Sequence, residues 1–188
     1  DIGANIGVFC VYAALRRNAN VYAFEPESKN YACLCKNLYL NGLGRRVKAL
    51  NVGLHDHTCI EYLQLHGMES GAALHSLGEA VDWRKQRYEA KFEQSVMAFS
   101  LDEFVERFKL PLPNHVKLDV DGNEPKILRG ARKTLSDPAL KSLMVETNGN
   151  DTELLDQLAS FGLKLSQQAR TGASYQGQDV FNALFTRA

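Results

Sequence analysis

The chain opens with a glycine-bearing loop that leads directly into an amphipathic segment. This loop, Asp1-Ile2-Gly3-Ala4-Asn5-Ile6-Gly7, has the pattern D-x-G-x-x-x-G, and Glu25 ends the next apolar run. Glycines at such a loop let the backbone approach a ligand closely, and an acid about 20 residues later hydrogen-bonds ribose hydroxyls. The spacing therefore predicts an adenosine-containing cofactor in a doubly wound α/β fold.

Two cofactor classes share this spacing, and the loop residues separate them. A dinucleotide brings a diphosphate to the loop, which favours the close-approach glycine of G-x-G-x-x-G and disfavours a fixed anion. Here Asn5 stands where that glycine is expected, and Asp1 places a carboxylate at the start of the loop. S-adenosylmethionine has no phosphate, and its sulfonium and ammonium groups attract a carboxylate. The loop favours S-adenosylmethionine, with an NAD(P)-dependent oxidoreductase or a non-catalytic interaction domain of the same fold as alternatives.

Helical and strand patterns alternate along the chain, which is typical of an α/β sheet with helices on both faces. Helices are expected over 6–17, 28–40, 101–108, 125–135 and 151–161. Strands are expected over 20–24, 47–52, 58–65, 96–99, 115–120 and 142–145, with a C-terminal antiparallel pair over 163–166 and 179–185. The segment 66–94 has no clean period, and such a loop is typical of a lid. Its candidate bases are His66 and His75.

Composition sets the size and the setting of the domain. A chain of 188 residues with 45% apolar content can build one core. We expect 1–188 to be a single domain that lacks the strand before its first loop. Basic and acidic residues number 22 each, so no net field favours nucleic acid or a membrane surface, and no apolar run is long enough to cross a bilayer. The four cysteines have no metal-ligand spacing, which indicates a reduced, cytoplasmic protein without a metal.

Three carboxylates follow the strand expected over 115–120. They are Asp119, Asp121 and Glu124, and the carboxyl end of a central strand is where ligands bind in open α/β sheets. Methyl transfer to a hydroxyl needs a group that removes the hydroxyl proton, and Asp119 is our first candidate for this base. Asp121 is equally well explained as a turn residue, and Glu124 as an acid at a helix start.

Three sequence blocks together resemble the FkbM-type methyltransferases. They are the loop 1–7, the block 21–26 with three asparagines behind it at Asn30, Asn37 and Asn41, and the block 117–124 leading to Leu128-Arg129-Gly130-Ala131. The resemblance covers nearly the whole chain and implies a Rossmann-like class I methyltransferase with a mostly parallel central sheet. The entry to the helix at Asn123-Glu124-Pro125 departs from the family pattern.

The resemblance also implies roles for individual residues. Asp1, Gly3, Asn5 and Gly7 would bind the methionine part of S-adenosylmethionine, Glu25 the ribose, and Asn51, Val52 and Gly53 would lie near the adenine. His55 and Asp56 follow and would either line the adenine pocket or form a solvated loop. The implied reaction is O-methylation of a hydroxyl on a small-molecule or glycan acceptor, such as a sugar, a glycolipid or a polyketide-like metabolite.

Overall fold

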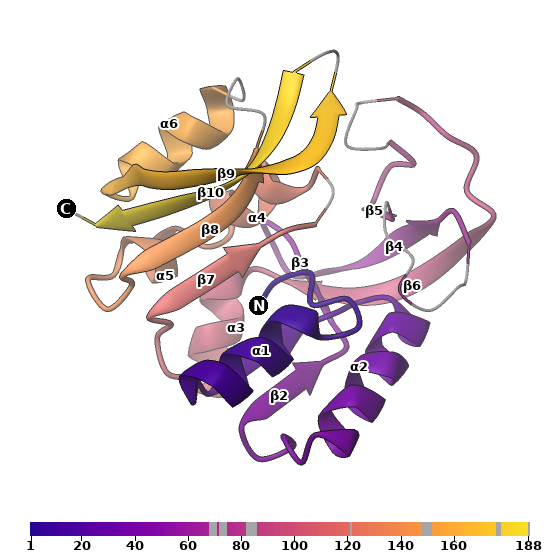
Figure 1. Cartoon of the computed structure of the whole chain (residues 1–188). Coiled ribbons are helices and arrows are strands. Elements are labelled where there is room, and N and C mark those ends of the chain that lie inside the picture. Colours follow the sequence, from indigo (N-terminus) through magenta and orange to yellow (C-terminus); the bar gives the residue numbers. More distant parts are fainter. Residues whose placement is uncertain are drawn as a thin grey trace. The chain divides into compact units, whose positions relative to one another are not determined.

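The computed structural model of the chain describes residues 1–67, 71, 75–81, 86–120, 122–147, 152–175 and 178–187 (Figure 1). The chain divides into two compact units. The first unit consists of Asp1–Leu54, Thr58–Ala98 and Val120–Asn123, and the second of His55–His57, Phe99–Asp119 and Glu124–Ala188.

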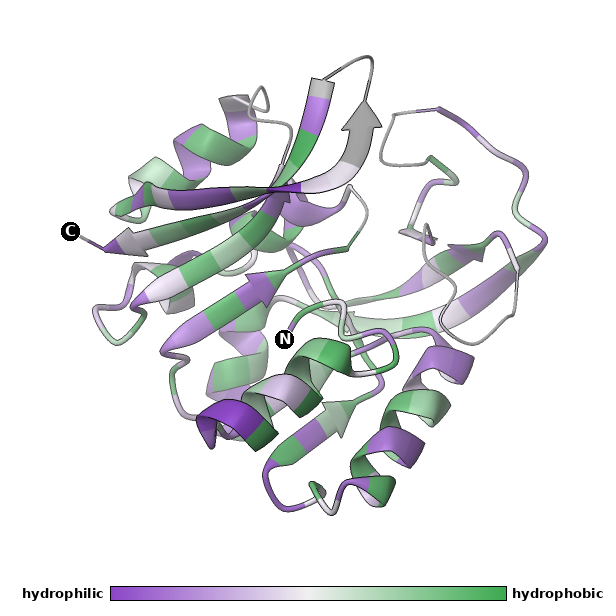
Figure 2. Ribbon diagram, viewed as in Figure 1, coloured by the Kyte–Doolittle hydropathy of each residue, from purple (hydrophilic) through white to green (hydrophobic). Residues whose placement is uncertain are grey.

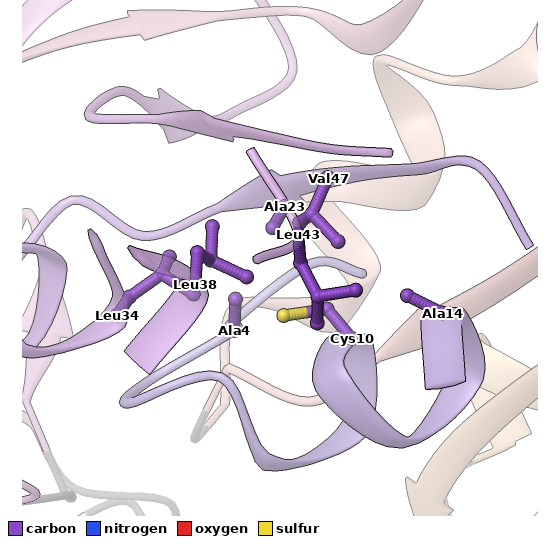
Figure 3. Close-up of a cluster of buried hydrophobic side chains, with 8 residues drawn as sticks. All are labelled: Ala4, Cys10, Ala14, Ala23, Leu34, Leu38, Leu43 and Val47. Atoms are coloured by element: carbon purple, nitrogen blue, oxygen red, sulfur yellow. The ribbon is translucent and has the colours of Figure 1, made fainter. Parts of the chain in front are cut away.

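A parallel strand pair with two helices opens the first unit. Strands β1 (Val21–Phe24) and β2 (Val47–Leu50) pair in parallel, with Val21 opposite Val47 and Ala23 opposite Ala49. Because side chains alternate along a strand, these four residues lie on one face of the pair. Helices α1 (Val8–Arg17) and α2 (Ser28–Leu40) pack there around a shared core (Figure 3). That core consists of Ala4, Cys10, Ala14, Ala23, Leu34, Leu38, Leu43 and Val47.

Local chemistry sets the ends of these two helices. Helix α1 follows Gly7 and ends at Asn18, both left-handed at φ 95° and 56°, a conformation that glycine and asparagine tolerate best. Helix α2 begins after Glu27, whose buried carboxylate accepts hydrogen bonds from the amides of Lys29 and Asn30. Both helices match the expected ranges closely. Among the described residues, no helix combines the length and apolar character needed to cross a bilayer.

A second sheet completes the first unit. Its strand order is β3-β6-β4-β5, with bounds β3 Gly53–Leu54, β4 Cys59–Leu65, β5 Ser76–Leu77 and β6 Phe92–Phe99. Leucine, valine and alanine side chains on β4, β5 and β6 form its core. The strand expected over 58–65 is confirmed as β4, whereas β6 starts four residues before the expected 96, at Phe92.

The second unit has a mixed sheet with the strand order β7-β8-β10-β9. Strands β7 (His115–Leu118) and β8 (Ser142–Thr147) are parallel, while β10 (Gln178–Arg187) runs antiparallel to both β8 and β9 (Leu163–Tyr175). The C-terminal antiparallel pair is therefore confirmed and is longer than expected. Parallel pairing joins β1 with β2 and β7 with β8, whereas β4 pairs antiparallel with β5 and β6, and β10 with β8 and β9, so the pairing is more mixed than the mostly parallel sheet that we expected.

Four helices accompany this sheet: α3 (Leu101–Phe108), α4 (Glu124–Arg129), α5 (Arg132–Ser136) and α6 (Thr152–Ser160). The single helix expected over 125–135 is wrong, because the chain breaks between α4 and α5. A Cβ atom on Gly130 would lie 2.2 Å from the His55 carbonyl oxygen, so another chain segment packs directly against the break. The Asp102 carboxylate accepts hydrogen bonds from the amides of Lys133 and Thr134, and its own amide donates to the Gly130 carbonyl. These tertiary contacts replace the helical hydrogen bonds.

The break generates a first prediction. Gly130→Ala should lower the free energy of unfolding by about 1–3 kcal/mol, because its methyl group would overlap backbone atoms of His55 and Asp56 that cannot move as a side chain does. Gly44→Ala is the matched control, since nothing lies within 4 Å of its Cβ position, and it should stay within about 0.5 kcal/mol of the parent. Urea unfolding of the three proteins measures both effects. Equal stability of the two variants would contradict the close contact at Gly130.

Candidate functional site

The glycine loop folds back onto the end of β1. The amides of Gly3 and Ala4 both donate to the Phe24 carbonyl, at 3.1 and 3.0 Å, and the Phe24 amide donates to the Asp1 carbonyl at 2.9 Å. Gly3 and Asn5 have φ values of 75° and 50°, in the left-handed region that residues with branched side chains avoid. The residue types of the loop are therefore those that its tight path requires.

The Glu25 carboxylate fastens this loop to the strand end. Its Oε2 accepts a hydrogen bond from the Asn5 amide at 2.7 Å, and its Oε1 accepts one from the Glu27 amide at 2.9 Å. The side chain is buried, with 5% of the residue exposed. A buried carboxylate needs such donors, because burial without hydrogen bonds destabilises its charge. Two predicted site residues, Asn5 and Glu25, are thus in direct contact.

Every amide from Gly3 to Gly7 donates within the protein. Beyond the bonds already described, the Ile6 amide donates to Asn5 Oδ1 at 2.7 Å and the Gly7 amide to the Ala4 carbonyl at 2.9 Å. A diphosphate bound at a glycine loop uses such amides as its hydrogen-bond donors. In this chain the loop amides already donate to acceptors of the protein, which favours a cofactor without phosphate.

Of the three residues expected near the adenine, Asn51 has the closest link to the loop. Its side-chain amide donates to the carbonyls of Glu25 and Pro26, at 2.9 and 3.1 Å, and so joins the ends of β2 and β1. Val52 is half-buried. Gly53 instead faces the core of the second sheet, where a Cβ atom would lie 3.1 Å from Leu77.

Two supporting residues had no predicted role. The Asn37 side-chain amide, on α2, donates to the Ile6 carbonyl at 2.8 Å and holds the loop from the helix side. Gln94, on β6, donates to the Pro26 carbonyl at 2.6 Å and accepts from the Ser28 amide at 3.0 Å. Asn37 belongs to one of the family-like blocks, whereas no sequence pattern marks Gln94, because only the fold brings it to Pro26.

The predicted catalytic carboxylates have different surroundings. Asp119 is 40% exposed, and its carboxylate lies 3.1 Å from the Nζ atom of Lys117, which is 11% exposed. Glu124 is buried as the first residue of α4, a position that suits an acid on the helix dipole. Asp121 lies outside the described residues.

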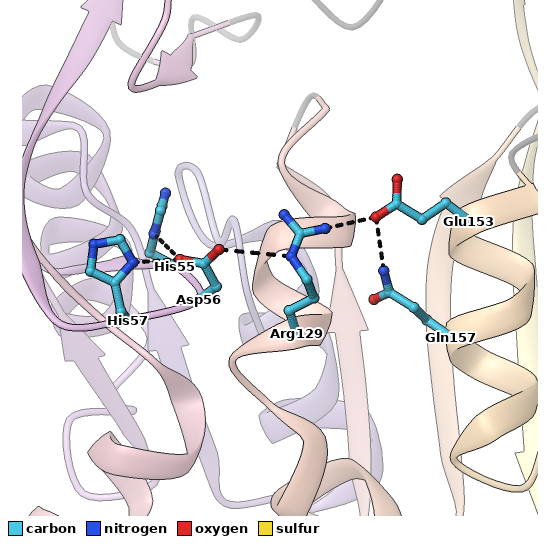
Figure 4. A network of polar contacts seen from close by, with 6 residues as sticks. All are labelled: His55, Asp56, His57, Arg129, Glu153 and Gln157. Atoms are coloured by element: carbon cyan, nitrogen blue, oxygen red, sulfur yellow. Dashed lines mark hydrogen bonds and ion pairs between the residues drawn. The ribbon is translucent and has the colours of Figure 1, made fainter.

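His55 and Asp56 take part in a network of polar contacts in the second unit (Figure 4). Asp56 Oδ1 lies 2.8 Å from His55 Nδ1 and 2.5 Å from His57 Nδ1, and Asp56 Oδ2 lies 3.7 Å from Arg129 Nε. Arg129 continues the network to Glu153 on α6, at 2.7 Å. Asp56 is therefore the centre of a network of polar contacts within its own unit.

This network lowers the pKa of Asp56. Partial burial alone would raise that pKa, but the hydrogen bond from His57 and the positive charges of His55, His57 and Arg129 outweigh burial. The carboxylate consequently stays ionised below the pH at which an ordinary aspartate gains its proton.

In the described part of the segment that we interpreted as a lid, several contacts converge on Tyr88. The Tyr88 hydroxyl lies 2.7 Å from Ser76 Oγ and donates to the Gln64 carbonyl at 2.8 Å, and the His66 ring stacks on the Tyr88 ring at 3.7 Å. His75 is half-buried. Ser70 and Trp83, which belong to the same segment, lie outside the described residues. Whether His66 or His75 acts on an acceptor stays a prediction.

Comparisons with known proteins agree on one family. A profile of the methyltransferase FkbM domain matches residues 1–165. The hexuronic acid methyltransferase AglP of Haloferax volcanii is 28% identical over 137 residues, which make up 72% of this chain and 50% of AglP. The methyltransferase sdnD of Sordaria araneosa is 46% identical over 55 residues, 29% of this chain and 21% of its own. The chain thus spans 50% of the length of AglP and 21% of the length of sdnD.

Solved structures share the fold at low sequence identity. The methyltransferase FkbM of Methylobacillus flagellatus aligns with a TM-score of 0.63 at 16% identity, over 99% of this chain and 42% of the other. TrmK of M. capricolum, solved in complex with S-adenosylhomocysteine, aligns with a TM-score of 0.54 at 11% identity, over 100% of this chain and 60% of the other. The expected Rossmann-like methyltransferase fold is confirmed.

The Asp56 network predicts a pH-dependent contribution to stability. Because the folded-state pKa of Asp56 lies below its unfolded value, the network stabilises the fold above about pH 4 and loses this effect as the pH falls through the folded pKa. Asp56→Asn should therefore lower the free energy of unfolding by roughly 1 kcal/mol at neutral pH, and by progressively less in acid.

Urea unfolding between about pH 6.5 and 2, which spans the range below the ordinary aspartate pKa, measures this difference. Glu103→Gln serves as the control, since it removes the charge that Glu103 pairs with Arg107 one helical turn away, and it should lower stability by less than about 0.5 kcal/mol. A deficit of Asp56→Asn that stays constant across the pH range would show that its charge does not stabilise the network.

Proposed function

The chain belongs to the FkbM methyltransferase family, and on this premise we propose that it transfers the methyl group of S-adenosylmethionine to a hydroxyl of a small sugar-like acceptor. The observation that carries the proposal is the loop at residues 1–7. Its amides donate within the protein, while the Asp1 carboxylate stands at its start and the Glu25 carboxylate accepts a hydrogen bond from its Asn5 amide. This arrangement suits a positively charged cofactor without phosphate and disfavours a dinucleotide.

In this proposal the first unit holds the cofactor. Asp1, Gly3, Asn5 and Gly7 bind its methionine part, and Glu25 accepts hydrogen bonds from the ribose hydroxyls. Each carboxylate oxygen can accept more than one hydrogen bond, so Glu25 can bind Asn5, Glu27 and the ribose together. Asn51 and Val52 contribute to the adenine end, whereas packing against Leu77 already explains why residue 53 is a glycine.

The acceptor is proposed to be a sugar hydroxyl, with a hexuronic acid as the first candidate. The support is the likeness to AglP, whose name specifies a hexuronic acid methyltransferase. S-adenosylmethionine supplies an already activated methyl group when bound. The chain must therefore align the acceptor hydroxyl and remove its proton.

Asp119 is our candidate for the base that removes this proton. It follows β7 directly, at the carboxyl end of a parallel strand, and is 40% exposed, so an acceptor can reach it. The contact with Lys117 at 3.1 Å fixes the orientation of its carboxylate. Asp121 and Glu124 are retained as candidates for orienting the acceptor, and the burial of Glu124 makes it the weaker of the two.

We propose that the protein works in a reducing compartment such as the cytoplasm. The support is chemical: Cys10, Cys33, Cys35 and Cys59 are all free thiols. Free cysteines of this kind persist where disulfides are kept reduced.

Calorimetry with S-adenosylhomocysteine tests the cofactor site. Glu25→Ala should weaken binding by about 1–3 kcal/mol, a five- to 150-fold rise in Kd, because ribose hydroxyls lose a buried acceptor. NADH should not compete. Asn37→Leu is the control for loop order, because it removes the other side chain that holds the loop without removing a proposed ribose partner. Equal weakening by both variants, or competition by NADH, would overturn the ribose assignment.

A turnover assay tests the candidate base. Asp119→Asn should lower kcat on a glucuronic acid glycoside about 100- to 10,000-fold, as expected when a general base is lost, and should leave the affinity for S-adenosylhomocysteine unchanged. Release of S-adenosylhomocysteine measures turnover. Lys117→Met should have a smaller effect, since Lys117 only orients the carboxylate. A variant at Asp119 with full kcat would remove it from the reaction.

A further inference from the structure

Charge is unevenly distributed in a chain whose formal net charge is zero. Between Ile6 and Leu50 the sequence contains seven basic residues, Arg16, Arg17, Lys29, Lys36, Arg45, Arg46 and Lys48, but only two acids, Glu25 and Glu27. Both acids are buried, with 5% and 2% of their surface exposed. The surface of this segment is therefore basic, although the composition of the whole chain hides it.

Four of these bases lie at one edge of the β1–β2 pair. Because the two strands are parallel, α1 and α2 both end at the edge where the strands begin. Arg16 and Arg17 form the last turn of α1, and Arg45 and Arg46 precede β2. The Arg46 guanidinium donates to the Asn18 side chain. This hydrogen bond links the connection between α2 and β2 to the connection between α1 and β1.

The four arginines are exposed and keep their charges available. In the part of the chain that the structure describes, none of them takes part in an ion pair. The helix dipole accounts in part for Arg16 and Arg17, because cations are favoured in the last turn of a helix. It does not account for Arg45 and Arg46, which lie outside the helices.

An apolar stripe on α1 leads to the same edge. Val8, Tyr12 and Leu15, spaced as one helix face, are 65%, 54% and 54% exposed. Together with Ile6 and Gly7 of the loop, Val11, Asn37 on α2 and Asn41 just after it, they line a groove of about 390 Å³, which reaches Arg16. Figure 2 shows this helix with apolar residues along its length and a hydrophilic last turn.

The end of α2 adds two more exposed apolar side chains. Tyr39 is 83% and Leu40 67% exposed, on the last turn of the helix that ends at the arginine-bearing edge. Exposed apolar side chains on this scale mark interaction sites rather than an ordinary surface. We call Val8, Tyr12, Leu15, Tyr39 and Leu40, with the four arginines, the α1–α2 surface.

We propose that the α1–α2 surface binds an anionic lipid membrane peripherally. Exposed apolar and tyrosine side chains beside a cluster of arginines suit the boundary between charged headgroups and acyl chains, where tyrosine presents a polar tip and arginine keeps its charge in water. Each nearby base adds attraction to anionic headgroups. Nucleic acid offers the matching charge but no apolar layer for Val8, Leu15 and Leu40. This proposal departs from the expectation, drawn from a net charge of zero, that a membrane surface is disfavoured as a partner.

The arginines and the proposed cofactor residues lie at opposite ends of the β1–β2 pair. Glu25 and Asn51 follow the carboxyl ends of β1 and β2, whereas the arginines lie where these strands begin. The apolar stripe of α1 starts at Val8, directly after Gly7 of the glycine loop. Variants of the arginines and of Leu40, at the end of α2, should therefore change membrane binding without changing cofactor binding.

Vesicle co-sedimentation with the full chain tests this inference. We expect binding to phosphatidylcholine vesicles that contain about 30% phosphatidylglycerol, weak binding to phosphatidylcholine alone, and a marked loss between about 50 and 300 mM salt. Arg16→Gln with Arg17→Gln should lower the partition coefficient about 25-fold, at about fivefold for each base. Leu40→Ser should lower it about tenfold.

A matched control distinguishes this surface from general charge. Arg132→Gln with Lys133→Gln removes two adjacent exposed bases from α5 and should change vesicle binding less than about twofold. Equal loss in both double variants, or no preference for anionic vesicles, would overturn the proposal. So would unchanged vesicle binding by Leu40→Ser, or tighter binding of duplex DNA than of vesicles, because each would indicate attraction to anions alone. Sedimentation velocity that shows a dimer dissolved by Leu40→Ser would assign the surface to self-association instead.

S-adenosylhomocysteine calorimetry on the same samples separates the two proposals. The arginine and Leu40 variants should bind S-adenosylhomocysteine like the parent, since none of these residues contacts the loop. Vesicle binding without S-adenosylhomocysteine binding would contradict the proposed function and leave the membrane surface standing.

Discussion

The arrangement of the first unit depends on one buried carboxylate. Glu25 accepts a hydrogen bond from the Asn5 amide with one oxygen and from the Glu27 amide with the other, so the loop, the end of β1 and the start of α2 meet at a single side chain. Glu27 then caps α2 with its own carboxylate. Two adjacent buried acids are tolerated because backbone amides satisfy both. The Asn5 amide is one of the loop amides that a diphosphate would need, so the structural role of Glu25 also disfavours a dinucleotide.

In the second unit, tertiary contacts decide local structure. The apolar pattern over 125–135 fits one helix, yet the backbone of His55 and Asp56 packs against Gly130, and the Asp102 carboxylate starts a new helix with the amides of Lys133 and Thr134. Arg129, at the end of α4, then reaches both Asp56 and Glu153. A glycine at the break gives the space that these contacts occupy.

The net charge of the whole chain does not describe the charge on the surface of its first unit. Equal numbers of acids and bases remove any net field, but burial withdraws Glu25 and Glu27 from the surface of the first unit. Arg16 and Arg17 end α1, and Arg45 and Arg46 precede β2. All four keep their charge in solvent beside exposed apolar side chains. A local field and an apolar face thus coexist in a molecule of zero formal charge. Parallel pairing of β1 with β2 brings the two arginine pairs to one edge, and the burial of the acids likewise requires the fold.

By itself, the sequence determined the class of fold, the positions of α1, α2, α3, β4 and the C-terminal strand pair, and the glycine loop with Glu25 as its partner. These features are local, because turn conformation, helix caps and residue periodicity act over a few positions. Only the tertiary structure decided that Asn51, Asn37 and Gln94 hold the loop and its strand end, that Asp56 joins an ion-pair network, and that the helix after β7 is broken. Each of these depends on segments far apart in the chain, whose contacts no spacing rule encodes.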